Sequence, residues 1–305
     1  MSWRAWLTFG MLCVIWGIPY FFIRIAVQDV PPLVVAWGRL TLAALILLPI
    51  AWRRGALSTL RPHLGAVCAF AIAEFVVPFS AICIGEVRIG SAMAGILIAG
   101  VPLTIAVVSR WLGVHEPLSP RRLLGLILGF LGVAGLAGFG PVSGVAGWIG
   151  VGCMVLATVG YAVGPLIIQR HLAALDSIGP VAGSLAIASL VLLVPALISF
   201  PTRTPPIAAM SAIVVLGVLC TAVAMLLMFY LVAHAGAARA SVITYINPVV
   251  ATLLGVGLLK ERLGASGYAA FAVILIGSWL ATRGGVPHRK AAAKSAPRGV
   301  ETAEI

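Results

Sequence analysis

Two charged residues lie inside long apolar segments of the chain, where a charge is costly. Glu74 is near the middle of an apolar segment over 63–84, and Arg39 lies within a segment over 33–51. A charged side chain at the centre of a membrane helix costs about 2.5–3.5 kcal/mol on insertion scales. Because few positions tolerate that cost, these two side chains are the first candidates for function.

Three roles for the two side chains are open. In the first, Glu74 is the proton-coupling residue, since a buried carboxyl can hold a proton and release it when the protein opens to one side. In the second, Glu74 and Arg39 form a fixed ion pair. In the third, Arg39 recognises an anionic group such as a substrate carboxylate, because its guanidinium fork binds carboxylates through two hydrogen bonds.

Aromatic and polar residues form two stripes with the same spacing. Residues at i, i+4 and i+8 lie on one side of a helix, and this spacing relates Trp16, Tyr20 and Arg24 in the first apolar segment, and Tyr161, Pro165 and Gln169 in the sixth. The stripes are either aromatic packing or the walls of a central cavity. On the second interpretation, the predicted substrate-binding residues are Trp16, Tyr20, Arg39, Glu74, Tyr161, Tyr245 and Asn247.

A proline-to-glutamate motif occurs twice. Val101-Pro102 precedes Glu116, and Asn247-Pro248 precedes Glu261, with apolar residues between. Proline removes a hydrogen bond from a helix and frees a carbonyl, which in a membrane must face protein or a wet cavity. Tyr245 and Asn247 are therefore polar contacts at depth, or the proline is a plain packing kink. Helix kinks are predicted at Pro78, Pro102, Pro165 and Pro248.

Glu116 and Glu261 each end a predicted helix beside basic residues. Arg121 and Arg122 follow the first, and Lys260 and Arg262 flank the second. Each glutamate forms either an interfacial salt bridge that stabilises a turn, or a bridge that breaks when the protein opens and so acts as a gate.

The composition indicates an integral membrane protein. The chain has 305 residues, of which 62% are hydrophobic and 9% charged, and these fractions exclude an ordinary soluble domain. Apolar runs of about 20 residues can each cross a bilayer as a helix. Ten such spans are predicted, over about 6–27, 33–51, 63–84, 90–111, 120–139, 147–168, 178–199, 208–232, 239–259 and 264–283.

Charge sets the predicted orientation. With the N-terminus in the cytoplasm, most arginines and lysines fall on the inner side, against Arg88, Arg203, Lys260 and Arg262 outside. This bias places both termini in the cytoplasm. The net charge of +12 is thus a topological signal, and no nucleic-acid partner is expected.

Five spans per half is an odd number, so the second half enters the membrane inverted. The predicted fold class is an all-α membrane protein of two inverted five-helix repeats, over 1–140 and 141–285, with a disordered cytoplasmic tail over 286–305. Inverted repeats supply two end states for alternating access. The second-half positions that correspond to Glu74, near Thr221 and Val223, are uncharged, so proton coupling would rest on the first half.

Other motifs indicate packing, and none indicates catalysis. The five cysteines lie in apolar segments without metal-type spacing, so neither a metal nor a cofactor is expected. Gly125 and Gly129, extended by Gly132, allow close helix approach, within the chain or between two copies; a monomer or weak dimer is expected. The chain has no phosphate-binding loop and no HExxH motif. An enzyme is therefore not expected.

The early Trp16-Gly17, the arginine Arg39 and the two proline-to-glutamate motifs with trailing glycines (Gly132 and Gly277) occur in the order typical of one family. With them, the chain resembles the EamA-type branch of the drug/metabolite transporter superfamily over about 6–283. Two departures are that the second half lacks an arginine matching Arg39, and that Val101 stands where the other half has Asn247.

The resemblance implies a multi-pass transporter of the bacterial inner membrane, commonly driven by the proton gradient. The predicted function is secondary active export of small metabolites, amino-acid-like solutes or drugs by proton antiport. The expected partners are the small-molecule substrate, protons and the lipid bilayer. The alternative is an uncoupled uniporter or channel for small solutes.

Overall fold

The computed structural model describes residues 3–98, 100–111, 120–139, 144–235 and 264–282, together with 142, 243, 247, 250, 254, 256–258 and 260. The first part of the chain forms α1 (Trp3–Ile15), α2 (Pro19–Ala26), α3 (Pro32–Arg53), η1 (Ser58–His63), α4 (Leu64–Phe70), η2 (Ala71–Val76), α5 (Val77–Glu86), α6 (Ser91–Ile98), α7 (Val101–Trp111) and α8 (Pro120–Phe139). The second part forms α9 (Gly144–Ile167), η3 (Ile168–Leu172), α10 (Ile178–Ile198), α11 (Ile207–Gly217), η4 (Val218–Val223), α12 (Ala224–Ala235) and α15 (Ala265–Thr282).

Within the described residues the protein is helical throughout. In the described part of the chain, six helical stretches are long and apolar enough to cross a membrane: Trp3–Ala26, Pro32–Arg53, Ser58–Glu86, Gly144–Leu172, Ile178–Ile198 and Ile207–Leu231. A bilayer core of about 30 Å needs about 20 helical residues, and each stretch satisfies this. The protein is thus an all-helical integral membrane protein. The count of ten spans stays a prediction, because most of 239–259 lies outside the described residues, as does the tail over 286–305.

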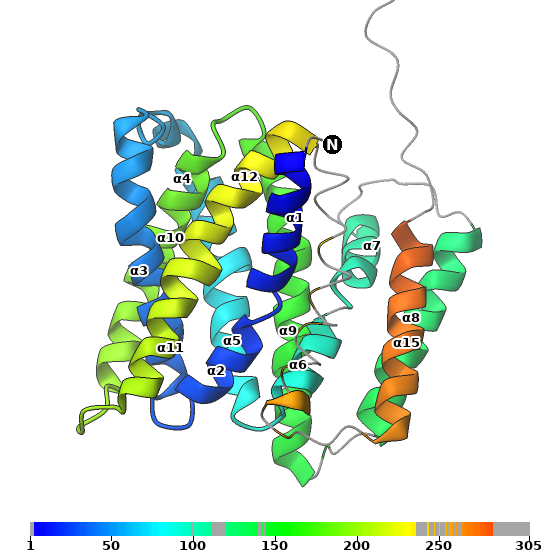
Figure 1. Ribbon diagram of the computed structural model, residues 1–305. Helices are drawn as coiled ribbons and strands as arrows, with labels where there is room; N and C mark the ends of the chain where they lie inside the picture. Colours follow the sequence, from blue (N-terminus) through cyan, green and yellow to red (C-terminus); the bar gives the residue numbers. More distant parts are fainter. Residues whose placement is uncertain are drawn as a thin grey trace, which may run out of the picture.

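The helices form a bundle in which elements far apart in sequence lie side by side (Figure 1). Helix α3 packs along α10, and α5 packs along α9. At the opposite edge of the bundle, α8 and α15 run together, with α7 between them and the remaining helices (Figure 1).

The two packed helices α3 and α10 each also contact the third helix of the other half of the chain. Helix α3 contacts α11 and η4, while α10 contacts α4 and η2. Between α3 and α10 themselves, the Thr41 and Ser189 hydroxyls share a hydrogen bond of 2.6 Å. On the α10 side, the Ser184 hydroxyl donates to the Val67 carbonyl at 3.0 Å. At the centre of the bundle, α3 and α10 therefore each pack against the half of the chain to which they do not belong.

Glycines bring α8 and α15 into close contact. A Cβ placed on Gly277 would lie 2.5 Å from the Gly129 nitrogen and 2.7 Å from the Gly125 oxygen. A Cβ on Gly132 would lie 3.0 Å from the Ile274 nitrogen. Only glycine allows backbones to approach this closely. The Gly125–Gly132 stripe therefore packs within the chain. This is one of the two alternatives that the sequence left open, the other being contact between two copies.

Two of the long helices contain a wide π-helical turn at their centre. In the first, η2 separates α4 from α5, and in the second, η4 separates α11 from α12. Both turns are six residues long. Short π segments inside α-helices occur often at functional sites, because they alter the direction of the side chains that follow. Glu74 is the fourth residue of η2, and Thr221 is the fourth residue of η4.

Candidate functional site

Glu74 projects from η2 onto a groove in α9. A Cβ placed on Gly164 would overlap the Glu74 carboxylate, and a Cβ on Gly160 would lie 2.5 Å from the Ala73 carbonyl and 2.7 Å from Pro78. The pair Gly160 and Gly164 therefore removes the side-chain volume that would otherwise block the wide turn. Close approach of this kind is what glycines four residues apart provide between membrane helices.

The Glu74 carboxyl has an unmet hydrogen-bonding need. Its Oε2 is buried and has no hydrogen-bond partner in the part of the chain that the structure describes. An ionised carboxylate taken out of water costs several kcal/mol unless it is paired. A proton on Glu74 would remove that cost, so the local surroundings suit a group that is neutral when enclosed and exchanges its proton when exposed.

Arg39 is held by contacts from both halves of the chain. Its Nε donates to the Thr221 hydroxyl at 2.8 Å, and its guanidinium carbon lies 4.0 Å from the centroid of the Phe79 ring. The residue is 6% exposed. A cation over an aromatic face gains about 2 kcal/mol when it is desolvated. Phe79 and Thr221 therefore fix the plane and the position of the guanidinium.

Thr221 also satisfies its own helix. Its hydroxyl donates to the Leu216 carbonyl at 2.9 Å, five residues earlier, while it accepts from Arg39. A wide turn shifts the backbone hydrogen-bonding register, and the hydroxyl reaches a carbonyl of that turn. Arg39 is thus connected through one side chain to the π-helical turn of the other half.

A buried glutamate that was absent from the predicted set joins Arg39. Glu86, the last residue of α5, has no exposed surface. Its charge and that of Arg39 both act electrostatically on the Tyr20 hydroxyl and on the Cys83 thiol. The Glu86 backbone carbonyl in turn accepts a hydrogen bond from Arg24 on α2. The end of α5 is therefore a second acidic position at this site.

Tyr161 lies within electrostatic reach of both Arg39 and Glu74. It lies on α9, three residues before Gly164, and is partly buried against the core. It interacts electrostatically with Tyr20, Arg39 and Glu74. Four of the predicted site residues are thus brought together from four separate elements: Tyr20, Arg39, Glu74 and Tyr161. The fixed ion pair between Arg39 and Glu74 is not the arrangement seen here, since Arg39 bonds instead to Thr221.

Trp16 and Asn247 lie at a break in the first membrane segment. Helix α1 ends at Ile15 and α2 begins at Pro19, and the Gly17 N–H donates to the Val14 carbonyl, three residues back, at 2.9 Å. The Cys13 carbonyl, four residues back from Gly17, is left available. With the Asn247 amide nitrogen facing α1, that amide donates to the Cys13 carbonyl at 3.3 Å and to the Ile243 carbonyl at 3.0 Å.

We expect Asn247→Val to lower the stability of the protein by about 1–2 kcal/mol. Valine is the residue at the matching position of the other half, Val101. The loss of stability is expected because the Cys13 carbonyl loses its donor inside the membrane, where water cannot replace it. Thermal unfolding in detergent measures the change. Gln169→Ala, which removes an exposed amide from η3, serves as the control and should leave the transition unchanged. Equal transitions for both variants would contradict the capping role of Asn247.

The predicted kinks have different outcomes. Pro78 lies in the first turn of α5, directly after η2. Pro102 is the second residue of α7, so the chain is interrupted between α6 and α7 rather than bent within one helix. Pro165 lies inside α9, two residues before that helix ends and η3 begins, and is exposed. Pro248 lies outside the described residues.

Three other predicted positions, Tyr245, Glu116 and Glu261, lie outside the described residues. Their roles as substrate contact and gates stay predictions. Within the described residues, no group of three or more histidine, cysteine, aspartate or glutamate side chains is arranged to hold a metal ion.

Comparison with known proteins identifies the family. The EamA-like transporter family matches the chain twice, over residues 4–138 and 148–283. The chain is 31% identical over 278 residues to the uncharacterized inner membrane transporter YedA of Escherichia coli K12, covering 87% of this chain and 88% of that protein. It is 26% identical over 278 residues to the uncharacterized transporter YvbV of Bacillus subtilis, with 89% of each covered.

A solved structure has the same fold. It is a crystal structure to which the chain is 22% identical, with a TM-score of 0.65, covering 92% of this chain and 98% of that one. At this identity the likeness concerns the fold alone. The two family matches and the identity to YedA carry the assignment further: the chain belongs to the EamA-like transporter family and is a membrane transporter, not an enzyme.

Proposed function

We propose that this protein is a secondary active transporter of the inner membrane that exports small metabolites, amino-acid-like solutes or drugs in exchange for protons. The observation that carries the proposal is the Glu74 carboxyl, which has a buried oxygen without a hydrogen-bond partner, in a π-helical turn beside Tyr161. A group of this kind can alternate between a protonated and an ionised state as the protein opens to either side.

Alternating access requires two related states, and the proposed inverted repeats would supply them. Two family matches of similar length support a duplication. The π-helical turns fall at the middle of the third helix in each half, and α3 and α10 each contact the third helix of the opposite half. Reciprocal contacts of this kind are expected of two halves that are related by a pseudo-two-fold axis in the membrane plane.

Localisation and orientation follow from the same reasoning. The relative in Escherichia coli is an inner membrane transporter, and the chain has helices that can cross a bilayer. The distribution of arginine and lysine supports the proposal that both termini lie in the cytoplasm. On this topology, the loop after α10 lies on the periplasmic side and the end of α3 on the cytoplasmic side.

Proton coupling is tested in proteoliposomes with a panel of amino acids, nucleosides and organic cations. A gradient of about one pH unit stores about 1.4 kcal/mol per proton, which supports about tenfold accumulation at one proton per solute. We expect vesicles with an acidic interior to accumulate the transported solute to about that extent, and protein-free vesicles to show no accumulation. Equal initial rates and no accumulation, with or without the gradient, would establish the uniporter or channel instead.

A further inference from the structure

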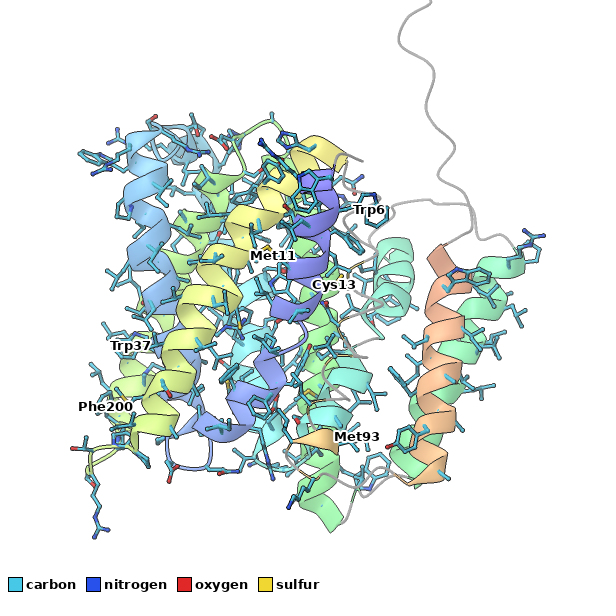
Figure 2. All side chains as sticks on the ribbon, viewed as in Figure 1. Trp6, Met11, Cys13, Trp37, Met93 and Phe200 are labelled. Atoms are coloured by element: carbon cyan, nitrogen blue, oxygen red, sulfur yellow. The ribbon has the colours of Figure 1, made fainter. Side chains whose placement is uncertain are left out.

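A groove lies between α3, α11 and the loop that precedes α11. Its cavity volume is about 530 Å³, within the range of small-molecule sites. The walls are formed by Val34, Trp37, Gly38, Leu42, Met210 and Val214, among others, and the rim by the loop residues Phe200 to Pro205. Trp37 and Phe200 lie at the same end of the molecule, away from the N-terminus (Figure 2).

The groove combines an apolar wall with one charged residue. Met210 and Val214 on α11 are about half exposed, as is Phe200 in the loop. Among the described residues that line the groove, Arg203 is the one with a charged side chain, and Thr202 and Thr204 flank it in the sequence. A guanidinium and two hydroxyls above an apolar surface match a phosphate group attached to a hydrocarbon chain.

Prolines restrain the backbone of the loop at the rim of the groove. It contains three prolines, Pro201, Pro205 and Pro206, in a stretch without regular secondary structure. Proline fixes the backbone angle φ near −65°, so the loop loses less conformational freedom when it closes on a ligand. Arg203 is therefore presented at the rim by a restrained segment.

The groove contains a buried hydrogen-bond donor, the indole N–H of Trp37. The Trp37 indole nitrogen is buried and makes no hydrogen bond to the part of the chain that the structure describes. A buried tryptophan N–H usually finds an acceptor. Tryptophan at a membrane interface commonly contacts the headgroup region, where phosphate and ester oxygens are acceptors.

We propose that this groove binds an anionic phospholipid, with the headgroup phosphate at Arg203 and a hydrocarbon chain along α3 and α11. The anionic class is favoured because none of the described residues that line the groove carries a carboxylate, and the ammonium of a zwitterionic headgroup has no counterion among them. The groove's location on the outer surface of membrane-spanning helices makes lipid the molecule most available to it.

Occupancy of the groove bears on the functional site through the same two helices. Gly38 and Thr41 face the groove from α3, while the adjacent Arg39 bonds to Thr221, which follows α11 in η4. A Cβ on Gly38 would lie 3.0 Å from the Ile213 side chain, so α3 and α11 already touch at this level. A bound lipid therefore sets the spacing between the elements that the Arg39–Thr221 hydrogen bond joins.

Native mass spectrometry of the full-length protein tests the proposal, with equimolar phosphatidylglycerol and phosphatidylcholine added to the detergent. We expect the wild type to retain phosphatidylglycerol about fivefold over phosphatidylcholine and Arg203→Ala to retain the two lipids equally. Arg88→Ala, which removes an arginine from a separate cavity at the same end, should keep the wild-type preference. Trp37→Phe should reduce retention of both lipids without changing their ratio.

Three outcomes would overturn the proposal. An unchanged lipid ratio in Arg203→Ala would remove Arg203 from the site. Thermal stabilisation by soluble glycerol phosphate equal to that by phosphatidylglycerol would indicate a phosphate site rather than a lipid site. Loss of a dimer in Arg203→Ala, with lipid retention unchanged, would assign the groove to a second copy of the chain. All three are measured without transport and so are independent of proton coupling.

Discussion

Glu74→Gln is expected to abolish accumulation driven by a pH gradient while the protein stays folded. The amide cannot gain or lose a proton at physiological pH, yet it fills the same space beside Gly164. Because the replaced carboxyl has a buried oxygen without a partner, stability should change by less than about 1 kcal/mol. Solute uptake into proteoliposomes, measured with and without the gradient, should become equal in this variant.

Two further variants test whether the effect of Glu74→Gln is specific to the acid at this position. Glu74→Asp keeps an acid one methylene shorter, so it should retain accumulation at a reduced rate. Asp176→Asn removes an exposed acid outside the membrane segments, in the turn before α10, and should behave as the wild type. If Glu74→Gln accumulated solute as the wild type does, the proton-carrier role would be wrong and another group would have to carry the proton.

Arg39→Ala is expected to lower stability by about 3 kcal/mol and to reduce transport to background. The estimate combines the cation–π contact with Phe79 and a charged hydrogen bond to Thr221. The buried Glu86 also loses a nearby positive charge, since both charges act on Tyr20. Thermal unfolding and flux under the pH gradient measure the two effects.

Milder changes separate the role of Arg39 in folding from its role in transport. Arg39→Lys keeps the charge but loses the planar fork, so it should fold and transport slowly. Thr221→Val removes only the hydroxyl that Arg39 contacts, and should cost about 1 kcal/mol. Arg53→Ala, at the exposed end of the same helix, is the control. Wild-type flux in Arg39→Lys would show that the guanidinium geometry is not needed for recognition.

Much of the fold could be predicted from hydrophobic periodicity, because each membrane helix carries its own signal. The predicted span over 120–139 coincides with α8, and that over 178–199 ends one residue after α10. The glycines at 132 and 277 could be recognised as close-contact positions before their partners were known. The helix that each glycine contacts could not be predicted, because pairing between distant segments leaves no local pattern in the sequence.

The site was predictable only in part. Unpaired charge in an apolar segment indicates Arg39 and Glu74, but the predicted span over 63–84 stops short of Glu86. The structure continues α5 to Glu86 and buries it. An acidic residue just beyond a predicted span was the available signal. The bond from Arg39 to Thr221 joins residues 182 positions apart, which sequence spacing alone cannot connect.

The wide turn formed by Ala71–Val76 has a mutational consequence. A turn of this type holds one residue more than a regular α turn, and each residue in a helix advances it by about 100°. Losing a single codon from this stretch, other than that of Glu74, would let the turn relax into ordinary α geometry while Phe79 and Glu86 keep their orientation toward Arg39. A deletion in a regular turn of the same helix has no extra residue to give up and would rotate both side chains away.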